Sequence, residues 1–281
     1  MKTIALVGSP NCGKTTLFNA VTGLHQHVGN WAGVTVERKE GTQNGVKWVD
    51  LPGVYALSPY SAEERVTIDY LSGGDYDEIL QIVDATALTR GLYLTHQLTQ
   101  LSRPMTIALN MMDECRKRGI TIDTEELSAR LGIRVLPMSA RDGTGVPELL
   151  RALKDGAKTP KSPPSAPYTA IIQRMKSVLP AGNLPSEFRA WKALEGDEMG
   201  AAEAARAGQA QLRAQFGMSA AAALSALRYA WADDLCAAVR RGNPDNPTRA
   251  DVIDALVLHP VLALPILAGL LALMLSLAFG R

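Results

Sequence analysis

The chain has 281 residues, enough for two compact domains, and its 29 basic side chains nearly balance its 28 acidic ones. Because the net charge is only +1, no overall electrostatic field draws the molecule to nucleic acid or anionic lipid. The three cysteines, Cys12, Cys115 and Cys236, form no CxxC pair, which argues against a disulfide framework or a thiolate metal site. These features favour a reducing compartment, and the cytoplasm is expected.

Short apolar strands alternate with helical patterns over residues 1–160, which predicts an α/β domain with a doubly wound, mostly parallel sheet. The expected strands are Thr3–Val7, Ile79–Val83, Met105–Leu109 and Arg134–Leu136. The helical patterns between them include Thr15–Val21, Gly91–Leu101 and Thr124–Leu131. Asn44-Gly45 is a strong hairpin signal between Val34–Glu40 and Val46–Asp50, so one antiparallel edge strand is expected there.

A proline- and serine-rich stretch, residues 161–167, is typical of an extended linker. The chain after it is rich in alanine, so residues 168–256 are predicted to form a small all-helical domain. The expected helices are Thr169–Leu179, Ser186–Leu194, Glu198–Gln215, Ser219–Arg240 and Thr248–Leu258, with Ser219 and Thr248 as plausible N-caps.

The stretch Val257–Phe279 is nearly all apolar and includes only His259 as a titratable residue. At about 1.5 Å per residue, a helix of this length would span a hydrocarbon core of about 30 Å. Residues 257–280 are therefore predicted to start a transmembrane segment, with a buried helix of a soluble protein as the alternative. Arg240, Arg241 and Arg249 precede it, which favours the cytoplasmic side for the rest of the chain.

Residues Gly8–Thr15 read Gly-Ser-Pro-Asn-Cys-Gly-Lys-Thr and match the P-loop pattern GxxxxGK[ST], directly after an apolar strand and before a helical pattern. Backbone amides of such a loop, together with the following helix N-terminus, bind phosphate. Lys14 would reach the β- and γ-phosphates, and the Thr15 hydroxyl would ligate magnesium. The predicted phosphate-binding residues are Gly8, Ser9, Pro10, Asn11, Cys12, Gly13, Lys14, Thr15 and Thr16.

Two further motifs favour GTP and GDP over ATP. The run Asn-Met-Met-Asp at 110–113 ends an apolar strand, where open α/β sheets bind ligands, and the Asp113 carboxylate can accept from guanine N1 and N2. The Ser-Ala-Arg loop at 139–141 resembles the GTPase loop whose alanine amide donates to guanine O6. The predicted base-binding residues are Asn110, Met111, Asp113, Ser139, Ala140 and Arg141.

The run Asp50-Leu51-Pro52-Gly53 matches DxxG. Asp50 would hold a magnesium-bound water, and the Gly53 amide would bind the γ-phosphate. Thr35, within Gly33-Val34-Thr35, is the candidate switch residue whose hydroxyl closes on magnesium only with the γ-phosphate present; the alternative is an ordinary strand threonine. The residues assigned to catalysis are Lys14, Thr35, Asn11 and Gly53.

The sequence departs from the Ras-like pattern at two positions. Val54 stands where a glutamine orients the attacking water, so unassisted GTP hydrolysis should be slow. Met112 replaces the lysine of NKxD, which predicts faster GDP exchange. Asn11 suggests a compensation, because GTPases with Gly-x-Pro-Asn loops can use this asparagine as a K⁺ ligand where an arginine finger would act. The alternative is that Asn11 only caps the loop.

The whole chain resembles the N-terminal cytoplasmic part of FeoB-type ferrous-iron transporters, most specifically in the Trp-x-Gly-Val-Thr element at 31–35. The other similar segments are 8–19, 29–37, 50–55, 110–113, Arg118-Gly119-Ile120 and His259-Pro260. The resemblance implies that 168–256 is a spacer domain favouring GDP binding. It also implies coupling to Fe(II) passage across the bacterial inner membrane, with the membrane-embedded core of the same polypeptide as partner. Because that core does not follow Arg281, a fragment is expected.

Other functions stay open at this stage. A soluble K⁺-dependent GTPase of tRNA modification or ribosome assembly would need a basic RNA-binding module, and residues 168–258 show no basic stripe, so no nucleic-acid partner is expected. A switch that acts by partner contact without useful hydrolysis is the third reading. His25 and His27 could bind iron, but two solvated histidines in a polar loop are favoured. Cys12 could sense redox state, but a packing role inside the P-loop is favoured. A homo-oligomer is left open.

Overall fold

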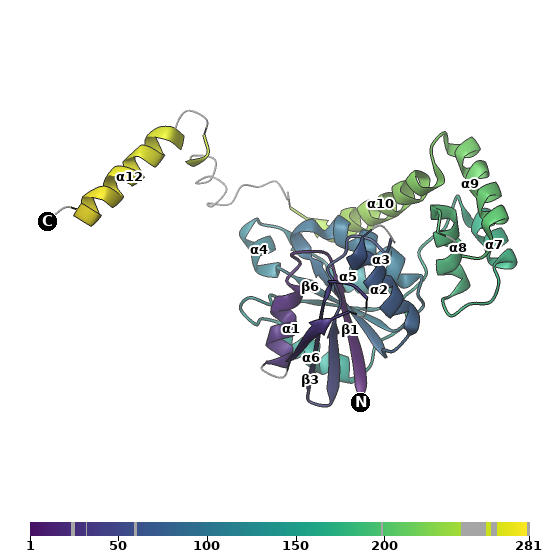
Figure 1. The fold of residues 1–281 in the computed structure, drawn as a ribbon, viewed down its shortest axis with the longest axis horizontal. Helices are drawn as coiled ribbons and strands as arrows, with labels where there is room; N and C mark the ends of the chain where they lie inside the picture. Colours follow the sequence, from purple (N-terminus) through teal and green to yellow (C-terminus); the bar gives the residue numbers. More distant parts are fainter. Residues whose placement is uncertain are drawn as a thin grey trace.

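The computed structural model describes residues 1–23, 26–31, 33–58, 61–197, 199–242, 257–259 and 263–279 (Figure 1). Within these residues, seven strands form one sheet in the order β2-β3-β4-β1-β5-β6-β8. Their bounds are β1 Lys2–Gly8, β2 Gln26–Asn30, β3 Glu37–Gln43, β4 Val46–Asp50, β5 Glu78–Asp84, β6 Met105–Asn110 and β8 Arg134–Pro137. Within this seven-stranded sheet of described strands, only the pairings of β3 with β2 and with β4 are antiparallel. The predicted fold class is thus confirmed.

Helices cover both faces of this sheet. They are α1 (Lys14–Thr22), α2 (Ala62–Gly73), α3 (Leu88–Thr99), α4 (Met112–Lys117), α5 (Thr124–Leu131) and α6 (Val146–Lys154), with a 3₁₀ turn at Ala85–Ala87. Because successive side chains of a strand point to opposite faces, β1 contributes Ile4 and Leu6 to one core and Ala5 and Val7 to the other. Phe18 of α1 packs in the first core, and Leu92 of α3 packs in the second.

The strand β2 and the helix α2 were not among the predicted elements. The strand β2 extends the predicted hairpin by pairing with the outer edge of β3, and its residues are mostly exposed, so they lack an apolar alternation. The helix α2 begins after a capping box in which the Ser61 side chain accepts from the Glu64 amide and Glu64 reaches back to the Ser61 amide. The Ser-x-x-Glu spacing at 61–64 was a signal that could have located this helix.

The later helices are α7 (Thr169–Val178), α8 (Ser186–Glu195), α9 (Ala202–Phe216) and α10 (Ala220–Val239). They match four predicted helices, although α9 begins at Ala202 instead of residue 198. Ser219 is the N-cap of α10, where its hydroxyl oxygen accepts from the Ala222 amide at 3.2 Å. The predicted N-cap Thr248, and most of the helix predicted after it, lie outside the described residues.

The helix α10 belongs to two cores at once, and Figure 1 shows it reaching from beside α3 towards α9. Ala223 and Leu224 pack among α7, α8 and α9, whereas Leu235 and Cys236 pack with the sheet domain. After α10, β9 (Arg240–Arg241) pairs antiparallel with β7 (Thr121–Ile122). Because α10 packs in both cores, it joins the two parts of the chain. The predicted division into a domain at 1–160 and a domain at 168–256 stays a prediction.

The helix α12 (Ala263–Phe279) contains no buried residue. None of the helices within the described ranges combines the length and the apolar character that crossing a membrane requires. The predicted segment 257–280 includes residues 260–262 and 280, which lie outside those ranges, and it stays a prediction.

His96 of α3 is fully buried between Trp191 and Trp231, with ring centroids 5.3 and 5.1 Å away. Burial, assisted by the nearby Arg228 charge, lowers the pKa of His96 to about 3. The unfolded chain, with a histidine pKa near 6.5, thus binds a proton between pH 6.5 and 3 that the folded chain does not. Stability should therefore fall as pH drops through this window, by up to about 1.4 kcal/mol per pH unit.

We expect His96→Gln to remove this one-proton slope from the free energy of unfolding, measured by urea denaturation at pH 7, 6 and 5. His27→Gln is the matched control, because His27 is exposed on β2. An unchanged acid slope in His96→Gln would show that another group governs acid sensitivity.

Candidate nucleotide site

A cavity of about 650 Å³ opens where β1, β6 and β8 end, at the carboxyl edge of the sheet. It brings the predicted P-loop together with both predicted base-binding loops. The lining residues are Ser9, Pro10, Asn11, Gly13, Lys14, Thr15, Thr16, Gly53, Asn110, Met111, Asp113, Glu114, Ser139, Ala140 and Arg141. Glu114 is the one lining residue that the sequence analysis missed, although its position directly after Asp113 in the first turn of α4 placed it close by.

The P-loop geometry suits an anion. Asn11 and Gly13 adopt positive φ angles of 63° and 87°, which turn the loop between β1 and α1. Gly13 caps α1 without any side-chain hydrogen bond, so the first amides of the helix remain available to a ligand. A side chain at Gly13 would collide with the Asn110 amide, so this close approach requires glycine.

The Asn110 side chain is held by hydrogen bonds to two loops of the site. It is 3% exposed, its Nδ2 donates to the Cys12 carbonyl at 2.8 Å, and its Oδ1 accepts from the Ala140 amide at 2.8 Å. One side chain thereby fixes the P-loop against the 139–141 loop. The Ala140 amide, predicted to donate to guanine O6, donates to Asn110 in this structure.

Asp113 is held in position to act as an acceptor. Its Oδ1 accepts from the Ser139 hydroxyl at 3.0 Å, and its Oδ2 lies 3.9 Å from the Lys117 ammonium. Met111 begins the turn into α4 with a φ of 64°, which places Asp113 in the first helical turn. The structure therefore has a carboxylate and a hydroxyl side by side in the lining of the cavity.

Lys14, which lines the cavity, forms a buried ion pair with Asp50; the exposed fractions of the two residues are 9% and 6%. Burial raises the pKa of Asp50 even though the Lys14 charge opposes that shift. The end of the DxxG motif is tied to the P-loop, since the Val54 amide donates to the Gly8 carbonyl at 3.0 Å. A Cβ at Gly53 would lie 3.2 Å from Pro10, so the two loops approach closely.

Several predicted residues lie outside the cavity lining. Thr35 is exposed, in a turn where the Val34 amide donates to the Trp31 carbonyl at 3.3 Å. The others outside the lining are Gly8, Cys12, Gly33, Val34, Asp50, Leu51 and Pro52. Burial raises the pKa of Cys12 to about 11, so its thiol is protonated and packs, which supports the packing reading over a redox sensor.

No group of three or more potential metal-ligating histidine, cysteine or acidic side chains occurs within the ranges that the structure describes. His25 lies outside those ranges, and His27 is exposed on β2. The oxygen donors of Thr15 and Asp50 nevertheless suit a hard cation such as Mg²⁺, whose remaining ligands are commonly phosphate oxygens and water.

Comparison with known proteins gives consistent matches. The family model described as "Ferrous iron transport protein B" matches residues 2–153. The Fe(2+) transporter FeoB of Escherichia coli K12 is 39% identical over 300 residues, which cover 99% of this chain and 38% of that protein. A Porphyromonas gingivalis Fe(2+) transport protein A/Fe(2+) transporter FeoB fusion protein is 44% identical over 212 residues, covering 69% and 25%. The chain therefore spans well under half the length of these relatives.

Solved structures show the same fold. A GDP-bound mutant of the S. thermophilus FeoB G-domain has a TM-score of 0.78 at 36% identity, covering 86% of this chain and all of that one. The cytosolic domain of T. maritima FeoB in its GMPPNP form has a TM-score of 0.76 at 30% identity, with the same coverage. The cytosolic domain of L. pneumophila FeoB gives 0.75 at 35% identity, covering 85% and 100%.

Proposed function

Because the chain belongs to the ferrous iron transport protein B family, we propose that it binds Mg-GTP and hydrolyses it as the regulatory domain of a bacterial Fe(II) transporter. The observation that carries the proposal is that Lys14 of the P-loop and Asp113 of the predicted base-reading loop line the same cavity. Such a cavity can bind the phosphates at one end and guanine at the other. The GDP-bound relative supports this assignment.

The switch role of Thr35 requires movement in this proposal. Thr35 is exposed and outside the cavity lining, so it must approach Thr15 for both hydroxyls to bind one magnesium ion. Asp50 would leave Lys14 to hold a magnesium-bound water, which frees the Lys14 ammonium for the β- and γ-phosphates. When bound, magnesium neutralises the charge that develops on the phosphates.

We further propose that GTP binding is coupled to Fe(II) uptake at the cytoplasmic face of the bacterial inner membrane. The relatives named above are Fe(2+) transporters, and the rest of their length would supply the membrane-embedded core as partner. In this arrangement residues 1–160 are the GTPase domain, 168–256 the spacer, and 257–280 the start of the membrane segment. The relatives do not favour a soluble GTPase of tRNA modification or ribosome assembly, and a homo-oligomer is not assigned.

Potassium is the proposed catalytic ion. Val54 is 2% exposed and packs in the core, so it cannot orient a water molecule, whereas Asn11 lines the cavity. We expect single-turnover phosphate release from GTP to be about tenfold to a hundredfold faster in KCl than in NaCl, since the ion supplies positive charge near the γ-phosphate. Asn11→Ala should abolish the difference between the two salts.

The matched control is Asn44→Gly, which changes another asparagine of positive φ in the distant β3–β4 turn and should keep the potassium effect. Equal rates in the two salts for the wild-type chain would remove the potassium role alone. Absence of phosphate release from GTP in either salt, or release from ATP at the same rate, would overturn the GTPase proposal.

A further inference from the structure

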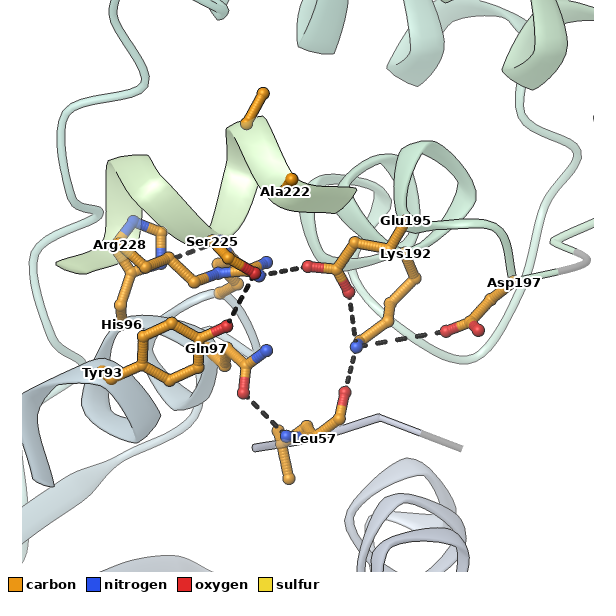
Figure 2. A network of polar contacts seen from close by, with 12 residues as sticks. Leu57, Tyr93, His96, Gln97, Lys192, Glu195, Asp197, Ala222, Ser225 and Arg228 are labelled. Atoms are coloured by element: carbon orange, nitrogen blue, oxygen red, sulfur yellow. Dashed lines mark hydrogen bonds and ion pairs between the residues drawn. The ribbon is translucent and has the colours of Figure 1, made fainter. Parts of the chain in front are cut away.

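A buried charge cluster, Lys192, Glu195, Asp197 and Arg228, joins α8 and α10 to the chain that follows the DxxG motif (Figure 2). Lys192 and Arg228 are each 1% exposed, and Glu195 lies between them. The Lys192 ammonium lies 2.7 Å from Glu195 Oε2 and 4.0 Å from Asp197, and Arg228 pairs with the other oxygen of Glu195. Opposite charges balance within the cluster, which is the condition under which buried charges are tolerated.

Lys192 also reaches outside the cluster to the sheet domain. Its ammonium donates to the Leu57 carbonyl, and the Leu57 amide donates to Gln97 Oε1 at 2.7 Å. Leu57 is fully buried, so its backbone is fixed from both sides in a site without solvent. Leu57 follows Gly53 by only four residues, and Gly53 lines the nucleotide cavity. Lys192 of α8 therefore positions Leu57. Because Leu57 is so close to Gly53 in the chain, a movement of Gly53 would also move the segment around Leu57.

Arg228 retains unused donors beside the same segment. Within the described part of the chain, its Nε and Nη2 have no hydrogen-bond partner, although the residue is buried. The guanidinium lies over the Trp191 ring at 5.1 Å and over the Tyr93 ring at 5.9 Å, which restrains its plane. It lines a cavity of about 130 Å³ together with Ala56 and Ser58. Buried donors without a partner are costly, and Ala56 and Ser58 of the neighbouring segment line the same cavity as Arg228.

We propose that Lys192 and Arg228 are alternative anchors for residues 56–58. Lys192 holds the Leu57 carbonyl in the arrangement seen here. When Gly53 moves to the γ-phosphate, the segment shifts into the 130 Å³ cavity and a backbone carbonyl accepts from the free Arg228 donors. The proposal rests on the proposed GTP function. Lys192 is then a positioning residue that opposes the GTP-bound form, and Arg228 is one that favours it.

Two variants should shift nucleotide preference in opposite directions. Lys192→Met removes the donor to Leu57 while Glu195 keeps Arg228, and we expect the ratio of GMPPNP affinity to GDP affinity to rise about tenfold. Arg228→Lys keeps a cation beside Glu195 but lacks the Nε and Nη2 donors, so the same ratio should fall about tenfold. Calorimetry on the purified chain measures both affinities.

Lys176→Met is the matched control, because Lys176 pairs with Glu187 at 3.6 Å within the helical region and should leave the ratio unchanged. Wild-type ratios in both folded variants would overturn the proposal. Hydrogen exchange of the wild-type chain gives an answer that needs no variant: exchange at the Leu57 amide should differ between the GDP and GMPPNP complexes, and equal exchange would also overturn it. If the wild-type chain binds neither nucleotide, the proposed function fails instead.

Discussion

The variant Asp113→Asn is expected to bind GDP about a hundredfold more weakly than the wild-type chain. The carboxylate can accept two charge-assisted hydrogen bonds from guanine N1 and N2, each worth about 1.5–3 kcal/mol, and asparagine would turn one acceptor into a donor that faces the guanine amino group. A loss of about 3 kcal/mol corresponds to about two orders of magnitude in Kd. Isothermal titration calorimetry with GDP measures this change directly.

The same substitution should improve binding of xanthosine diphosphate, because the xanthine 2-oxygen accepts where the guanine amino group donates. Glu114→Gln is the matched control: Glu114 also lines the cavity and lies next in sequence, but its carboxylate pairs with Lys117 at 2.6 Å. This control should retain GDP affinity within a fewfold. If Asp113→Asn binds GDP as tightly as the wild-type chain, Asp113 does not read the base.

Lys14→Met should abolish measurable GTP binding and also destabilise the protein freed of nucleotide. The substitution removes the cation at the phosphates, and it leaves the Asp50 carboxylate buried without its partner. Breaking a buried pair in this way costs about 3–5 kcal/mol of folding free energy. Denaturant unfolding at pH 7 measures the loss of stability, and calorimetry measures the loss of binding.

The double variant Lys14→Met with Asp50→Asn separates the two effects. Because neither charge remains, most of the stability should return while GTP binding stays absent. The pH dependence has a defined sign: burial raises the pKa of Asp50, and loss of Lys14 raises it further. The cost of Lys14→Met is thus fully present above that folded pKa and vanishes as Asp50 is protonated at lower pH. A single variant as stable as the wild type at pH 7 would contradict this account.

Local patterns of the chain located much of the sheet domain and most of the cavity. The P-loop between an apolar strand and a helix, the Asn44-Gly45 turn and the Ser219 cap each depend on a few consecutive residues. The conformational preferences of such segments act before any distant contact forms. The local sequence therefore suffices to predict these elements. The edge strand β2 escaped prediction because its pairing with β3, and not its own pattern, makes it a strand.

Sequence patterns were enough to predict that a phosphate-binding turn follows β1 and that an acidic base-reading residue follows β6, at the same edge of a parallel sheet. The folded chain was needed to show that Asn110 joins the P-loop to Ala140, that Lys14 pairs with Asp50, and that Thr35 lies outside the cavity lining. The contact of Lys192 with Leu57 is likewise visible only in the folded chain. The physical reason is that these contacts join residues far apart in the chain, and a side chain selects such a partner only after packing has brought the surfaces together.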